Sequence, residues 1–91
     1  MNKEQEDIEV MEQQETENEK ALLLINDDVN TFDYVINTLM KVCHHTRAPA
    51  ESCAWITQYK GQCAVMHGSF DELKPHYDLL LAHHLTAKIS D

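Results

Sequence analysis

The stretch from Leu22 to Leu39 constrains the fold of this chain more than any other segment. Its sequence, LLLINDDVNTFDYVINTL, begins with an apolar run, continues with polar residues and ends with helical periodicity. An apolar run bounded by turn formers is typical of a buried strand. We therefore expect a strand followed by a helix, with Asn26, Asp27 and Asp28 between them. Their amide and carboxylate oxygens form an acceptor-rich cluster with no neighbouring base or nucleophile, which indicates cation binding rather than catalysis.

The first half of the chain predicts one strand and two helices. Residues 21–26 show no polar alternation, so we expect a strand covered on both faces. Asn30 is in position to cap the next helix, with Asp33 in the capping-box position three residues later. A second helix is expected between a cap at Thr46 and a stop signal at Gly61.

The second half predicts two further strands around a third helix. Residues 62–67 form a short apolar run, and a capping box at residues 69–72 starts the helix. Pro75 lies beyond the first turn, so we expect a break or kink near Lys74. Residues 85–90 alternate between apolar and polar, which predicts a strand with one buried face. The predicted order is strand, helix, helix, strand, helix, strand.

The acidic charge is concentrated near the start of the chain. Residues 1–20 hold eight of the sixteen acidic residues against two lysines, and so carry −6 of the net charge of −9. Such a segment buries too little apolar surface to fold. We therefore expect a disordered acidic extension over residues 1–19 and a single folded domain over residues 20–91, a size that gives only marginal stability.

The composition disfavours several classes of function. Phosphate binding needs clustered basic residues, and Arg47 is the one arginine, so we expect no nucleic-acid partner. No apolar run approaches a membrane span of about 18 residues, and the start of the chain has no apolar signal segment. We therefore expect a cytoplasmic protein with no membrane partner. The three cysteines are an odd number in such a chain, so we expect reduced, mostly buried thiols.

Catalysis and metal binding find little support in the sequence. Asp27 and Asp28 have no second catalytic group beside them, so we expect no enzymatic activity. The histidine pairs at residues 44–45 and 83–84 are adjacent in sequence, and adjacent side chains on a helix point about 100° apart. Because such pairs do not share a tetrahedral ion easily, we expect no bound metal, and nothing indicates a cofactor.

Several features occur together from about residue 20 to the C-terminus. They are the motif LINDD at residues 24–28, the capped helix with Val35 and Ile36, the second helix ending at Gly61, and the order of elements. With these features the chain resembles the ClpS family, adaptors of the ATP-dependent Clp protease that bind proteins by a destabilising N-terminal residue. The resemblance implies an α/β domain, an α+β sandwich in which three helices pack on a three-stranded antiparallel sheet in the order βααβαβ.

The resemblance also implies a binding site. It assigns Asn26, Asp27 and Asp28 to the α-amino group of a client protein, together with a residue of the second helix that is usually histidine. This chain has Gln58 there, whose amide oxygen also accepts a hydrogen bond from an ammonium group. An apolar pocket would hold the client's first side chain. Its predicted lining is Asn30, Phe32, Val35, Ala54, Thr57 and Leu85.

Phe32 and Ala54 stand where the family usually has methionines, which leaves the preferred N-terminal residue open. Without the resemblance, the polar cluster also fits a solvated turn, and the apolar lining also fits plain core packing.

Two functions therefore remain. In the first, the chain is a non-catalytic, monomeric adaptor that binds N-degron client proteins with a bulky hydrophobic first residue. It would deliver them to the N-terminal domain of a Clp AAA+ unfoldase, with the acidic extension as a mobile segment that engages the protease. In the second, it is an interaction domain of the same fold whose degenerate pocket reads no N-termini. A pocket between Asn26 and Gln58 with inward-facing oxygens would favour the first.

Overall fold

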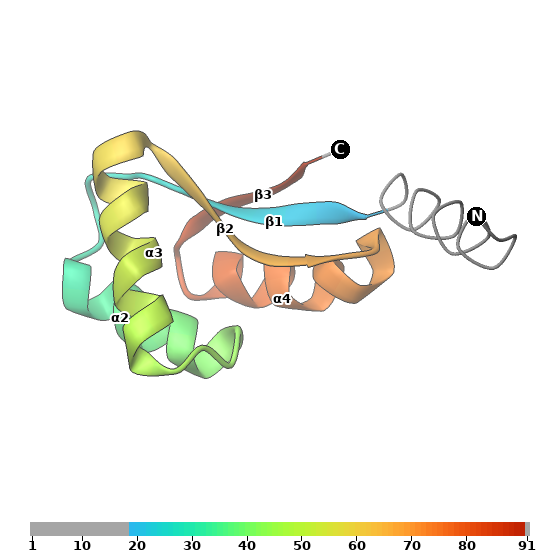
Figure 1. The fold of residues 1–91 in the computed structure, drawn as a ribbon, viewed down its shortest axis with the longest axis horizontal. Coiled ribbons are helices and arrows are strands. Elements are labelled where there is room, and N and C mark those ends of the chain that lie inside the picture. Colours follow the sequence, from blue (N-terminus) through green and yellow to red (C-terminus); the bar gives the residue numbers. More distant parts are fainter. Residues whose placement is uncertain (1–18, 91) are drawn as a thin grey trace, which may run out of the picture.

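The computed structural model describes residues 19–90, which form one antiparallel sheet and three helices (Figure 1). Along the chain the elements are β1 (Lys20–Ile25), α2 (Phe32–Val42), α3 (Arg47–Lys60), β2 (Gln62–Gly68), α4 (Phe70–Ala82) and β3 (Thr86–Ser90). In the sheet, β1 lies between β2 and β3 and pairs antiparallel with both. The predicted α+β fold and its βααβαβ order are confirmed. The acidic extension predicted over residues 1–19 lies outside the described residues, apart from Glu19.

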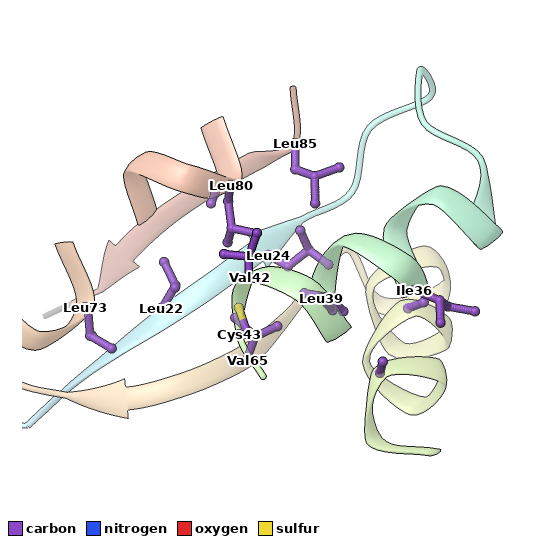
Figure 2. Close-up of a cluster of buried hydrophobic side chains, with 13 residues drawn as sticks. Leu22, Leu24, Ile36, Leu39, Val42, Cys43, Val65, Leu73, Leu80 and Leu85 are labelled. Carbon is purple, nitrogen blue, oxygen red and sulfur yellow. The ribbon is translucent and has the colours of Figure 1, made fainter. Parts of the chain in front are cut away.

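The core forms on one face of the sheet. Leu22 and Leu24 of β1 are buried with side chains from all three helices, and Figure 2 shows this cluster between the strands and the helices. The intervening residues Ala21, Leu23 and Ile25 are only partly buried. The expectation of a strand covered on both faces is therefore wrong, because the core packs against alternate residues of β1.

The ends of α2 and α3 are set by different signals. The cap of α2 is Thr31, whose Oγ1 accepts a hydrogen bond from the Tyr34 amide at 3.1 Å. The predicted cap at Asn30, with Asp33 in a capping box, is therefore wrong. Helix α3 follows Thr46 as predicted, but the Thr46 side chain makes no capping hydrogen bond. The helix ends at Gly61 as predicted, and Gly61 takes the left-handed conformation with φ of 97°.

Helix α4 begins with the predicted capping box. Ser69 Oγ accepts from the Glu72 amide at 3.2 Å, and Glu72 Oε1 accepts from the Ser69 amide at 2.8 Å. The helix then continues through Pro75, so the break expected near Lys74 does not occur. Proline removes the bond to the carbonyl four residues earlier, that of Asp71, but both residues are exposed and water can satisfy that carbonyl.

A bulge in the pairing of β1 with β2 ties the segment between α2 and α3 to the sheet. Leu22 pairs with Met66 and Leu23 with Ala64, so the register skips Val65. The Val65 carbonyl instead lies 2.8 Å from His45 Nε2, which donates to it.

No helix within residues 19–90 is long and apolar enough to cross a membrane.

Candidate functional site

A cleft of about 430 Å³ opens where the loop after β1 meets α2, α3 and Leu85, the residue before β3. All ten predicted site residues line it, so the fold gathers residues that lie up to 59 positions apart in sequence. The lining comprises Leu24, Ile25, Asn26, Asp27, Asp28, Asn30, Phe32, Val35, Ala54, Thr57, Gln58 and Leu85. Leu24 and Ile25 were missed by the sequence analysis, although their position directly before the polar cluster is a signal for them.

Asp27 is held by its own loop and by β3. Its Oδ1 accepts from the amides of Val29 at 3.0 Å and Asn30 at 3.2 Å, and its Oδ2 accepts from Thr86 Oγ1 at 3.2 Å. The Asn30 side-chain amide lies 3.2 Å from both carboxylate oxygens. Partial burial acts to raise the pKa of Asp27, but the hydrogen bonds outweigh it and hold the pKa below its usual value. Asp27 is therefore ionised and its side chain is fixed.

Two further hydrogen bonds set the position of this loop. The Asn26 amide donates to the Gly61 carbonyl at 2.9 Å, which fixes the end of β1 against the end of α3. The Tyr34 hydroxyl donates to the His83 carbonyl at 2.8 Å and joins α2 to the end of α4. The loop that carries the polar cluster is therefore fixed to the end of α3, and α2 is fixed to the end of α4.

The remaining polar side chains of the cleft make no such bonds. Within residues 19–90, the side chains of Asn26, Asp28 and Gln58 have no hydrogen-bond partner, and all three residues are exposed. Each offers at least one acceptor oxygen to the cleft. Two carboxylates and no lysine, arginine or histidine line the cleft, so its charge favours a cation.

Apolar side chains form the other part of the cleft. Ala54 and Thr57 of α3 are 3% and 5% exposed, and Leu85 is 3% exposed, so this wall is buried. The Thr57 hydroxyl is buried without a partner among the described residues. Phe32 of α2 also lines the cleft, and its ring meets the ring of Trp55 edge-on at 5.5 Å between centroids.

Trp55 extends the apolar surface beyond the cleft. Its ring stacks on Tyr59 at 4.8 Å, and the two residues are 51% and 67% exposed. Neither residue was predicted from the sequence to be part of the site. Their spacing of four residues on α3, beside Ala54 and Gln58, was the available signal.

The side chains that line the cleft are suited to binding. The cleft contains no histidine, cysteine, serine or lysine that would act as a base or nucleophile beside the carboxylates. Within the described part of the chain, no three histidine, cysteine, aspartate or glutamate residues come together to hold a metal ion. The site combines acceptors for a cation with a buried wall for an apolar group.

Two of three comparisons with known proteins found matches. The family model described as "ATP-dependent Clp protease adaptor protein ClpS" matches residues 15–88. Among solved structures, the fold is similar to that of Agrobacterium tumefaciens ClpS2 bound to L-phenylalaninamide, with a TM-score of 0.69 and 18% sequence identity. The alignment covers 80% of this chain and 95% of that one. A search of curated proteins found no match.

Proposed function

The chain belongs to the ClpS family of ATP-dependent Clp protease adaptors, and from this premise we propose that its cleft binds the free N-terminus of client proteins. The client's first residue would be bulky and hydrophobic, with its α-amino group at Asn26, Asp28 and Gln58 and its side chain against Phe32 and Ala54. The adaptor would then deliver the client to a Clp AAA+ unfoldase, with no catalysis of its own.

The observation that carries this proposal is the set of unpartnered acceptors. An N-terminal ammonium has three donors, and Asn26, Asp28 and Gln58 supply three side-chain acceptors that no other described residue uses. Each hydrogen bond to a charged group contributes about 1.5 to 3 kcal/mol. Asp27, whose oxygens already accept hydrogen bonds, would add charge and position the loop.

The apolar wall supplies the second part of the binding energy. Burying a Leu or Phe side chain contributes roughly 1.5 to 3 kcal/mol. After the cost of association, the two parts together give a binding free energy on the order of −8 kcal/mol, a micromolar complex. Phenylalaninamide, the compound bound to the Agrobacterium ClpS2 of similar fold, combines a free ammonium with an aromatic side chain. That combination matches the two parts of this cleft.

A peptide titration tests the proposal. Trp55 is the one tryptophan of the chain and its ring contacts Phe32, so its fluorescence reports on the cleft. We expect a peptide beginning with Phe to change this fluorescence with micromolar affinity, and its N-acetylated form to bind at least tenfold more weakly. The Asp28→Asn variant should lose affinity, whereas Asp78→Asn, an equal change of charge on α4, should not.

The alternative function, an interaction domain of the same fold that reads no N-termini, predicts the opposite result of this titration. The replacement of the usual histidine by Gln58, and of methionines by Phe32 and Ala54, favours it. If the free and acetylated peptides bind equally or not at all, the cleft does not read N-termini and the chain is an interaction domain of the same fold.

Delivery requires a separate measurement. We propose that the adaptor acts as a cytoplasmic monomer and docks on the N-terminal domain of the unfoldase. It should accelerate degradation of a reporter with N-terminal Phe by a Clp AAA+ unfoldase and its peptidase, and Asp28→Asn should abolish the acceleration. Light scattering of the purified chain tests the monomeric state.

A further inference from the structure

Two cysteines from different elements bring their sulfur atoms into contact beside the cleft. Cys63 of β2 and Cys53 of α3 lie 3.2 Å apart at Sγ. Both sulfurs also lie near one backbone acceptor, the Ala64 carbonyl, at 3.6 Å from Cys63 and 3.8 Å from Cys53. The third cysteine, Cys43, is buried in the core, whereas Cys53 and Cys63 are partly exposed.

We propose that Cys53 and Cys63 form a reversible disulfide when the protein meets a peroxide. A disulfide bond is about 2.05 Å long, so the two sulfur atoms need to approach by only about 1.2 Å. The residues between them include the turn at Gly61, where α3 ends and β2 begins. The bridge would join two elements that already pack together, with no rearrangement of the fold.

The order of the two chemical steps follows from the surroundings of Cys53. Desolvation by burial, together with the hydrogen bond that Cys53 shares with Cys63 and the proximity of the other two thiols, raises the pKa of Cys53 to about 12. Cys53 therefore stays protonated at neutral pH and is a poor first nucleophile. We therefore write the attack on the peroxide with Cys63 as the nucleophile and the second, resolving step with Cys53; the bridge formed is the same in either order.

The reaction balances with hydrogen peroxide as oxidant. The Cys63 sulfur attacks one peroxide oxygen and breaks the O–O bond, which gives a sulfenic acid on Cys63 and, with the thiol proton, one water. The Cys53 sulfur then attacks Cys63 Sγ, forms the S–S bond and displaces hydroxide. The hydroxide takes the Cys53 proton and leaves as the second water. The two sulfurs lose two electrons, which the peroxide gains, and a dithiol reductant reverses the change.

The bridge would fix two walls of the cleft against each other. Cys53 directly precedes Ala54, and Cys63 pairs across the sheet with Leu24, and both of these neighbours line the cleft. Closing a short loop removes conformational freedom from the unfolded chain. In a domain of this size we expect the oxidised protein to melt roughly 5 to 10 °C higher than the reduced protein. This inference stands on the sulfur geometry and does not depend on the proposed function.

The experiment treats the full chain with hydrogen peroxide and then measures its intact mass and its free thiols after denaturation. We expect a monomer lighter by about two daltons, with one thiol left of the three. Peptide mapping should show Cys53 linked to Cys63, and dithiothreitol should restore all three thiols. The Cys43→Ser variant should still form the bridge, whereas Cys53→Ser and Cys63→Ser should not.

Three results would overturn the proposal. They are a bridge between Cys43 and Cys53, a disulfide-linked dimer, and a gain of oxygen on single cysteines without loss of two thiols. Mapping of the parent protein decides between these results even if a serine variant folds poorly.

Discussion

The Asn30 side-chain amide donates to the Asp27 carboxylate at 3.2 Å and to the His84 carbonyl at 2.9 Å. One side chain thus joins the loop after β1 to the loop before β3, across 54 positions of sequence. Because Asn30 has two amide hydrogens, it can satisfy both acceptors. The position of the polar cluster in the cleft therefore depends on an amide that is itself part of the cleft lining.

We predict that Asn30→Asp destabilises the domain. The new carboxylate has no amide hydrogens, and it would face the Asp27 carboxylate and the His84 carbonyl without a donor between them. The free energy of unfolding should fall by about 2 kcal/mol or more. Asn37→Asp, the same change at an exposed position on α2, should alter it by less than about 0.5 kcal/mol. Urea titrations of the three proteins measure the difference, and equal values for both variants would contradict the prediction.

Replacing Asp27 should lower the stability of the domain more than replacing Asp28. Asp27→Ala removes the acceptor of the Val29 and Asn30 amides, so it should lower the free energy of unfolding by about 1 to 2 kcal/mol and weaken peptide binding at least tenfold. Asp28→Ala should weaken binding by a similar factor with little change in stability, because Asp28 makes no hydrogen bond within residues 19–90. Thermal melting and peptide titration of both variants test this. Unchanged binding by both would remove the two carboxylates from the amine site.

The lowered pKa of Asp27 predicts a loss of stability in acid. A carboxyl group whose pKa is lower in the folded than in the unfolded chain stabilises the fold above its unfolded pKa, about 3.9. That contribution is lost as the pH falls from there through the folded pKa. The parent should therefore lose more stability below about pH 4 than Asp27→Asn does. Asp28→Asn is the control with the same change of charge. Because it keeps Asp27, it should still show the part of the stability loss in acid that comes from Asp27. Urea titrations at several pH values measure the free energy of unfolding, and an equal fall with pH for the parent and Asp27→Asn would contradict the prediction.

Local signals predicted the elements whose ends are set locally. The capping box of Ser69 and Glu72 and the stop at Gly61 involve neighbours in sequence, and both are present in the structure. The cap of α2 was misassigned because Asn30 bonds to His84, a partner that no local pattern reveals. The helix continues through Pro75, where Asp71 and Pro75 are both exposed, and that exposure also depends on the tertiary fold.

The candidate site could also be predicted only in part from the sequence. The polar cluster was identified from its place after an apolar run, and Gln58 through the family resemblance, and both line one cleft. The sequence did not reveal that Asp27 is occupied by hydrogen bonds while Asp28 is free, because Thr86, one of the donors, is 59 positions away. It also did not reveal the contact of Cys53 with Cys63, since the two sulfurs meet only when α3 packs on β2.

Ala54 should control the size of the client side chain. It is 3% exposed and lines the cleft, so a larger side chain there would fill the space proposed for the client. We predict that Ala54→Trp weakens binding of a peptide beginning with Phe at least tenfold, with circular dichroism unchanged. Ala48→Trp adds the same side chain at an exposed position of α3 outside the cleft and should bind normally. Unchanged affinity of a folded Ala54→Trp would place the client's side chain elsewhere.

Because Gln58 stands where the family usually has histidine, we predict that peptide binding by this chain depends on pH differently from binding with a histidine there. A histidine at this position must be neutral to accept from the client's ammonium, and with an unperturbed pKa of about 6.5 it becomes a like charge near pH 5.5. The Gln58 amide has no proton to gain in this range. Binding of a peptide beginning with Phe should therefore change little between about pH 7 and pH 5.5, a range in which Asp27 remains ionised.

The matched variant is Gln58→His, which should retain affinity at neutral pH and lose it on acidification. Peptide titrations at both pH values, on the parent and the variant, measure the difference, and circular dichroism at each pH separates binding from unfolding. No histidine lines the cleft of the parent, so a parent that itself lost most of its affinity at pH 5.5 would place the client's amino group away from Gln58.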